Sequence, residues 1–179
     1  MLSRLVYRCK QFYYALFSVY SKNDEKFAGF YLQPQELGLF NQLPGFEKKH
    51  SVVVARKMLA MSRLHPELDP NKLARIGLLH DVGKVLEHNS AFTKALLVIL
   101  RFLLPWVYEI LAEKGRTDLR FRRIYLYKYH GELGAELLEK LGVSKEILVA
   151  VKKHDPKVEP PAKDDPLELA LLQKSDSTL

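Results

Sequence analysis

The chain has 179 residues, which suits one domain with a substantial core, and its 47% hydrophobic content excludes a disordered chain. Its single cysteine, Cys9, excludes an internal disulfide framework and a zinc site built from thiolates. The net charge of +7 favours an anionic partner such as a phosphorylated ligand, nucleic acid or an acidic membrane surface. No segment has the pattern of a signal peptide, so we expect a cytoplasmic protein.

The N-terminal part of the chain is predicted to differ from the rest. Residues 3–20 favour an amphipathic helix in which basic and aromatic residues are interleaved. Such interleaving occurs in proteins that bind single-stranded nucleic acid, but helices of this kind more often pack on their own domain, so we do not expect nucleic acid as a partner. Residues 21–33 look like a linker. We therefore divide the chain into an N-terminal helix and linker over 1–33 and a main domain over 34–179.

Apolar residues recur with helical spacing through nearly all of the main domain, and the alternation of apolar and polar residues that is typical of strands is scarce. The expected fold class is therefore all-α. Proline suits the first position of a helix, which supports starts at Pro34 and Pro70, while Gly83 is typical of a helix end. Pro105 is expected to bend or divide a long helix. The predicted helices cover 34–41, 44–64, 70–81, 90–115, 117–130 with Thr117 as a cap, 131–141, 144–154, and a last helix that starts at Pro166.

The most apolar stretch covers residues 95–111. Arg101, Pro105 and Glu109 interrupt it, so it falls short of the roughly 18 to 20 apolar residues that a membrane span needs. We favour a buried helix over two alternatives, an interfacial membrane helix and a dimer contact. A peripheral membrane contact therefore stays open as a partner, and the sequence does not indicate the oligomeric state.

Six side chains of the types that commonly bind metals are distributed along the predicted helices: His50, His80, Asp81, His130, His154 and Asp176. Imidazole and carboxylate donors from several helices can meet inside a helical bundle, where they suit two transition-metal ions. Asp81 is the natural bridge because it has one oxygen for each metal. Asp155, Asp164 and Asp165 compete with Asp176 for the last position, and Asp176 is favoured because it lies in a helix.

The motif His80-Asp81-Val82-Gly83-Lys84 resembles the HD superfamily of metal-dependent phosphohydrolases, in its branch with His-Asp-Ile/Val-Gly-Lys motifs. The segment that begins His130-Gly-Glu-Leu-Gly134 and the last predicted helix resemble the same branch, so the resemblance covers roughly residues 44–179. It implies an all-α HD-domain helical bundle, here with an extra N-terminal helix. It also implies one metal held by His50, His80, Asp81 and Asp176 and a second held by Asp81, His130 and His154.

The resemblance implies hydrolysis of a phosphoester or phosphoanhydride, and we expect a nucleotide or dinucleotide as the small phosphorylated substrate. Two divalent ions (Fe or Mn, or Zn, Co or Ni) about 3.5–4 Å apart can activate a shared water, and the hydroxide attacks phosphorus in line. We expect Asp81 and Lys84 to be catalytic, with Lys84 as a point charge on phosphate. The basic run over 116–128 is either a solvated face or a funnel for phosphates. It supplies three further candidates for substrate binding: Arg122, Arg123 and Lys128.

Two alternatives fit the same donors. Some HD-fold proteins use a di-iron centre for oxygen-dependent cleavage of small polyols or phosphonates, and fold alone does not separate these chemistries. A non-catalytic module that binds a metal and a nucleotide, or docks on a membrane surface, is the other alternative. The cyclic-dinucleotide branch has a Gly-Tyr-Pro motif and often two adjacent histidines where this chain has His154-Asp155. Neither feature is present in the sequence, so we do not expect cyclic di-GMP hydrolysis.

Overall fold

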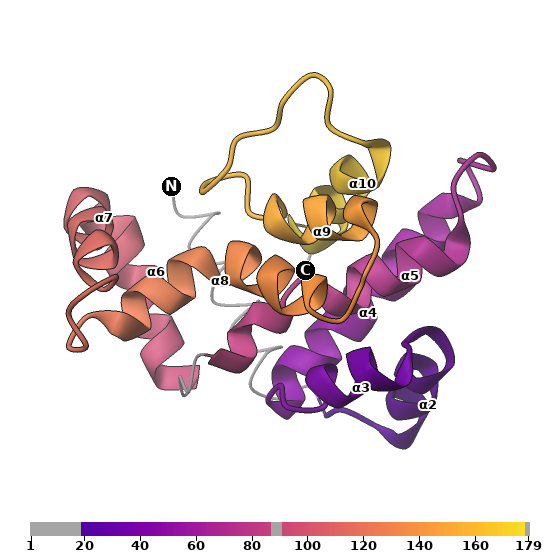
Figure 1. The fold of residues 1–179 in the computed structure, drawn as a ribbon, viewed down its shortest axis with the longest axis horizontal. Helices are drawn as coiled ribbons and strands as arrows, with labels where there is room; N and C mark the ends of the chain where they lie inside the picture. The colour runs from indigo at the N-terminus through magenta and orange to yellow at the C-terminus, as the bar shows by residue number, and fades with distance from the viewer. Residues whose placement is uncertain (1–18, 87–90, 178–179) are drawn as a thin grey trace.

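The computed structural model describes residues 19–86 and 91–177. Within these residues all regular structure is helical, which confirms the predicted all-α class. The amphipathic helix predicted over 3–20 lies almost entirely outside the described residues. The described elements (Figure 1) are α2 (Lys22–Tyr31), α3 (Pro34–Phe40), α4 (Gly45–Ser62), α5 (Pro70–Leu79), the 3₁₀ helix η1 (Val82–Leu86), α6 (Ala91–Leu103), α7 (Pro105–Lys114), α8 (Arg122–Glu139), α9 (Lys145–Lys152) and α10 (Leu167–Ser177).

The pair of helices α4 and α5 forms the centre of the fold. The short connection over 63–69 reverses the chain, so the two helices pack as an antiparallel pair. A Cβ on Gly77 would lie 2.5 Å from the Cα of Ala55, so this close approach requires glycine. The pairing brings the first half of α4, which carries His50, next to the end of α5, where Asp81 follows.

Most of the segment over 21–33 forms the helix α2, which packs on the core, so the predicted linker is wrong. Ser21 caps α2, because its hydroxyl accepts a hydrogen bond from the backbone of Asp24, while the carboxylate of Asp24 accepts one from the backbone of Ser21. Ala28 and Leu32 then join the hydrophobic core. The segment opens with a polar run and has few apolar residues, so its helical period is weak. The capping box of Ser21 and Asp24 is the local feature of the sequence that indicates the start of this helix.

The segment that follows α5 and the middle of α8 pack so closely that their backbones are in contact. α5 ends at Leu79 and the chain turns into η1, so the helix end predicted at Gly83 comes too late. A Cβ on Gly83 would lie 1.9 Å from the carbonyl oxygen of His130, so glycine is required where η1 crosses α8. α8 has a kink at Tyr129, with φ −101° and ψ 17°, where two helical stretches meet within two residues of the break predicted between residues 130 and 131.

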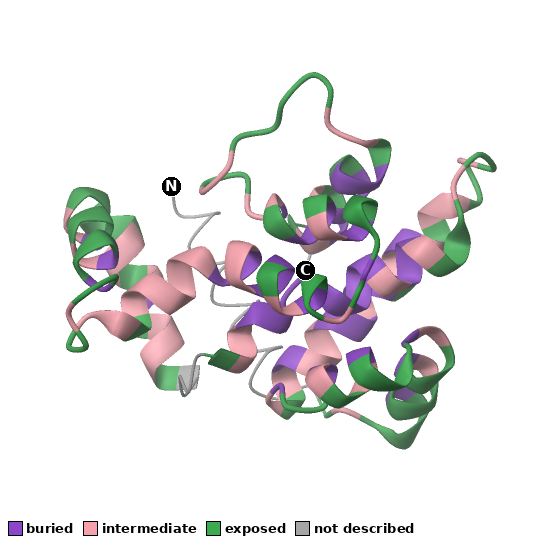
Figure 2. Cartoon of the chain, in the orientation of Figure 1, coloured by how far each residue is buried: buried purple, intermediate pink, exposed green. Residues whose placement is uncertain are grey.

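Pro105 divides the apolar stretch into α6 and α7, as predicted, but most of the stretch is not buried. Leu97 and Tyr108 face inward, whereas the exposed large side chains of these helices and their junction are Phe92, Leu96, Ile99, Phe102, Leu103, Leu104, Trp106 and Ile110 (Figure 2). The expectation of a buried helix over 95–111 is therefore wrong for the outer face of α6 and α7. Among the described helices, none combines the length and hydropathy of a membrane span. The next helix starts at Arg122, so Thr117 is not its cap.

Candidate metal centre

Five helical elements place the six predicted donors around one point. α10 packs against α4, and α8 packs against both η1 and α9, which brings together segments that are far apart in sequence. His80, Asp81, His130 and His154 are buried, while the side chains of His50 and Asp176 are partly exposed. The donors come from α4 (His50), the end of α5 (His80 and Asp81), α8 (His130), the residues after α9 (His154) and α10 (Asp176).

The two carboxylate oxygens of Asp81 face two different groups of imidazoles. Its Oδ2 lies 3.5 Å from Nε2 of His50 and 3.3 Å from Nε2 of His80. Its Oδ1 lies 3.1 Å from Nε2 of His130 and 3.5 Å from Nε2 of His154. Donor atoms of each group lie within 4.8 Å of one another. Asp81 is therefore placed so that it can share a cation with each group.

Asp176 joins the first of these groups. Its Oδ1 lies 3.0 Å from Nε2 of His50. Two of the three aspartates that competed with it in the sequence are engaged elsewhere, since Asp155 accepts a hydrogen bond from Arg101 at 3.0 Å and Asp165 accepts one from Lys153 at 2.8 Å. The third, Asp164, is exposed in the loop before α10. The position of Asp176 comes from the packing of α10 on α4.

The three buried imidazoles are held in place through their Nδ1 atoms. In His80, His130 and His154, Nδ1 lies 2.7–2.9 Å from the backbone carbonyl oxygen three residues earlier. A carbonyl oxygen can only accept, so we assign the ring proton to Nδ1 in each case. The lone pair of each Nε2 then points toward Asp81. Histidine ligands of metals are usually oriented by a hydrogen bond of this kind.

The surroundings of these Nε2 atoms allow a test of whether a metal fits. His80 Nε2 is buried and makes no hydrogen bond within the described part of the chain. His130 Nε2 and His154 Nε2 face each other at 3.0 Å. With both protons on Nδ1, two lone pairs point at each other, which is favourable only around a cation. The donor set is nitrogen and carboxylate oxygen without sulfur, so it fits divalent transition metals.

The carboxylates of the centre are anionic at neutral pH. Burial opposes the ionisation of Asp81, but His80, Lys84 and the other imidazoles hold its pKa well below the usual range. Burial also opposes the ionisation of Asp176, and the hydrogen bond with His50 outweighs it and lowers the pKa. The centre therefore presents negative charge to a cation without a change of protonation.

The sequence model of the HD domain matches residues 48–179, a range that contains all six donors. The chain belongs to the HD domain family. This confirms the resemblance recognised in the sequence and places the chain in a family of metal-dependent hydrolase type. No curated protein and no solved structure matched the chain.

A second layer of charged residues supports the centre of this HD domain. Lys84 donates to Oδ2 of Asp81 at 2.6 Å and to Oε2 of Glu47 at 3.1 Å, and Lys94 of α6 binds the other oxygen of Glu47. Burial would raise the pKa of Glu47, but the two lysines hold it below its usual value. We did not predict Glu47 and Lys94 from the sequence. The available signal was weak: Glu47 lies one turn before His50, on the same helix face.

The predicted substrate-binding cations are not equally close to the centre. Lys128 lines a pocket of about 340 Å³ together with His154, and acidic residues of α7 pair with it. Arg122 and Arg123 lie at the start of α8, about two turns before His130. The structure thus brings Lys128 to the edge of the centre and leaves the two arginines at a distance from it.

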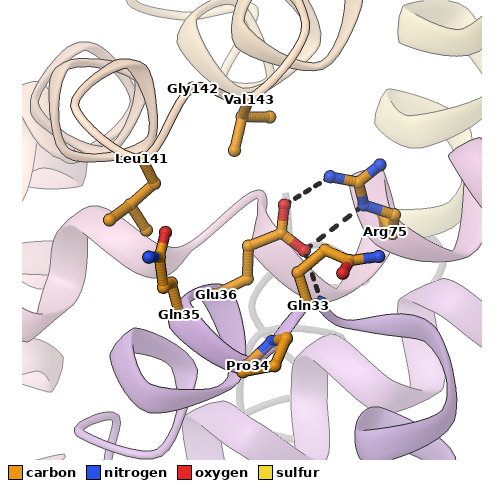
Figure 3. A pocket seen from close by; sticks show the side chains of 8 residues that line it. All are labelled: Gln33, Pro34, Gln35, Glu36, Arg75, Leu141, Gly142 and Val143. Carbon is orange, nitrogen blue, oxygen red and sulfur yellow. Dashed lines mark hydrogen bonds and ion pairs between the residues drawn. The ribbon is translucent and has the colours of Figure 1, made fainter.

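Another pocket, of about 330 Å³, lies between α3 and the turn that joins α8 to α9 (Figure 3). Its charged groups bind each other, since Arg75 Nε donates to Glu36 Oε2 at 3.3 Å. The lining residues are Gln33, Pro34, Gln35, Glu36, Arg75, Leu141, Gly142 and Val143. None of the six donors is among them, so this pocket is separate from the metal centre of the HD domain.

Proposed function

We propose that this HD domain is an enzyme, a metal-dependent phosphohydrolase that cleaves a phosphoester or phosphoanhydride of a nucleotide or dinucleotide. The observation that carries the proposal is the position of Asp81, whose two oxygens face two separate groups of imidazoles. One carboxylate placed between two donor groups suits two divalent ions. One ion would be held by His50, His80, Asp81 and Asp176, and the other by Asp81, His130 and His154.

Two bound divalent ions supply an activated water and positive charge beside the phosphoryl oxygens. Asp81 keeps the two donor groups at a fixed separation, and the Nδ1 hydrogen bonds keep the imidazole rings in orientation. Lys84 lies beside Asp81, so its ammonium reaches a phosphate that is bound at the centre. There it offsets the negative charge that builds up on the phosphoryl oxygens during attack.

The pocket beside His154 supports a substrate larger than a phosphate alone. Its volume of about 340 Å³ can hold a sugar or a base next to the reacting group. Burial alone would lower the pKa of Lys128, but hydrogen bonds with Glu109 and Tyr129 have the larger effect and raise it. This lysine is therefore cationic at neutral pH. Lys128 would then bind a second phosphate. Arg122 and Arg123 would draw the anionic substrate toward the centre from farther away.

The test is a screen of phosphate release from nucleotides and dinucleotides by protein loaded with Mn or Fe. We expect at least one of these substrates to be cleaved. Asp81→Ala should lose the activity, whereas Asp164→Ala, which changes an exposed loop carboxylate, should keep it. Protein whose metal site is full but which cleaves no phosphorylated substrate contradicts the proposal. Oxygen uptake by the iron-loaded protein without phosphate release would favour the di-iron oxygenase instead.

A further inference from the structure

The junction of α6 and α7 exposes a continuous apolar surface that the metal centre does not use. Residues 102–106 are five consecutive exposed apolar residues, and Phe102 and Trp106 have relative exposures of 56% and 66%. On α6, the exposed residues Phe92, Leu96, Ile99 and Leu103 recur at spacings that place them on one helix face. These helices form one end of the molecule (Figures 1 and 2). Soluble monomers rarely expose such a run without a function for it.

The charged side chains of α6 turn away from this apolar face. Lys94 binds Glu47 of α4, and Arg101 donates to Oδ2 of Asp155 at 3.0 Å. They are the only charged residues of α6, and both are directed into the body of the protein. The outer face of α6 is therefore without charge along its whole length.

A strongly basic turn follows this apolar surface. Residues 114–123 contain five basic residues and one acid, Asp118. Leu119 is 85% exposed in the middle of the turn, next to the exposed Arg120. The exposed apolar side chain of Leu119, surrounded by basic residues, would fit a surface that has an apolar interior and anionic groups on its outside.

We propose that the face formed by α6, α7 and the turn over 114–123 docks on an anionic lipid bilayer. The junction around Trp106 would lie at the level of the headgroups, where tryptophan is favoured, with the neighbouring apolar residues immersed. The basic turn would bind the anionic headgroups. A second copy of the chain could cover the apolar residues, but it would bring a second turn whose net charge is also positive. This inference does not rest on the proposed function.

The experiment is sedimentation of the full chain with phosphatidylcholine vesicles, with and without phosphatidylserine. Trp106 is the only tryptophan, so its fluorescence reports directly on this face. We expect binding to the anionic vesicles, a shift of Trp106 emission to shorter wavelength, and weaker binding at high salt. The double variant Phe102→Ser/Leu103→Ser should bind roughly tenfold more weakly or worse, because it removes two large apolar contacts.

The matched control is Phe30→Ser on α2, which changes an even more exposed aromatic residue at another place and should leave binding unchanged. Lys114→Ser/Arg120→Ser should weaken binding only to anionic vesicles, with the exposed Lys26→Ser as its control. Failure to sediment, or equal sedimentation of the wild type and the Phe102/Leu103 variant, overturns the proposal. A doubled molar mass in solution with Trp106 already shielded from water would assign the face to a second copy of the chain.

Discussion

Asp24 and Asp81 are both buried carboxylates, with relative exposures of 1% and 2%, but their surroundings differ in kind. Asp24 accepts hydrogen bonds from Ser21, and it pairs with Lys49 at 2.8 Å and Arg56 at 3.0 Å. Asp81 faces four imidazoles and one lysine. One carboxylate thus has permanent cations as partners, whereas the other has mostly weak bases that offer lone pairs.

This difference separates a structural carboxylate from a chemical one. Lys49 and Arg56 stay charged at every ordinary pH and balance the charge of Asp24. Asp24 therefore links α2 to α4, and its effect is on the stability of the fold. Asp81 has one ammonium beside it, that of Lys84, and the buried imidazoles around it point their lone pairs at the same small volume. That arrangement is complete only with a cation. Burial and charge alone would not distinguish the two aspartates, whereas the chemistry of their neighbours does.

The largest effect is expected for Asp81→Asn, which keeps the shape of the side chain and removes its charge. The rate of hydrolysis should fall by roughly a hundredfold to a thousandfold or more. The two ions that would stabilise the negative charge on the phosphoryl oxygens would lose Asp81, the ligand that they share. Thermal unfolding of the metal-free protein should change less than in Asp24→Asn. Initial rates and melting curves of the three proteins check this, and a variant with near wild-type rates would show that Asp81 is not the shared ligand.

Asp24→Asn should act in the opposite way. The hydrogen bonds from Lys49 and Ser21 outweigh burial and lower the pKa of Asp24 to about 2, from an ordinary value of 3.8. This shift corresponds to about 2 kcal/mol of unfolding free energy. Urea unfolding in the presence of a chelator measures the loss, and Asp164→Asn is the exposed control. Metal content should not change, and a loss of metal in Asp24→Asn would contradict the separation of the two sites.

The contribution of Asp24 should also depend on pH in a defined direction. Because its folded-state pKa is depressed, the stabilisation is fully present above the ordinary value of 3.8 and is lost as the pH falls through about 2. The difference in unfolding free energy between the wild type and Asp24→Asn should therefore shrink between about pH 5 and pH 2. A difference that stays constant over this window, or grows, would mean that Asp24 is not held by its charge.

The smallest effect is expected for Lys84→Met. Metal content should be kept while kcat/KM falls by roughly tenfold, because one point charge beside the phosphate is lost. Glu47→Gln, which loosens the hold on Lys84 without removing it, should lower the rate less. Lys26→Met on α2 is the control. An unchanged rate in Lys84→Met with a full metal site would restrict this lysine to a structural role.

Local signals predicted most of the helices. Pro34, Pro70 and Pro105 each stand at the first position of an observed helix, where the missing backbone N–H has no cost. The helix over 22–31 was missed because its apolar period is weak, and its position on the core depends on contacts with α4, above all the ion pairs of Asp24. Local apolar content could not show these contacts.

The order of histidines and aspartates indicated the donors of the site, since these residue types are few and recognisable. Their supporting residues could not be found in this way. The Glu47–Lys94 pair joins positions 47 residues apart, and Arg101–Asp155 joins positions 54 residues apart. The exposure of the apolar stretch was equally hidden, because hydropathy records which residues avoid water and not which neighbours are present to cover them.

The sharing of Asp81 between two metal ions is the feature on which the proposed function depends most. It is tested most directly by the metal content of protein purified without chelator, measured beside Asp81→Ala and the loop control Asp164→Ala. We expect about two transition-metal ions per chain in the wild type and in the control, and the loss of both in Asp81→Ala. No bound metal after loading, or the same metal content in Asp81→Ala as in the wild type, would contradict the account.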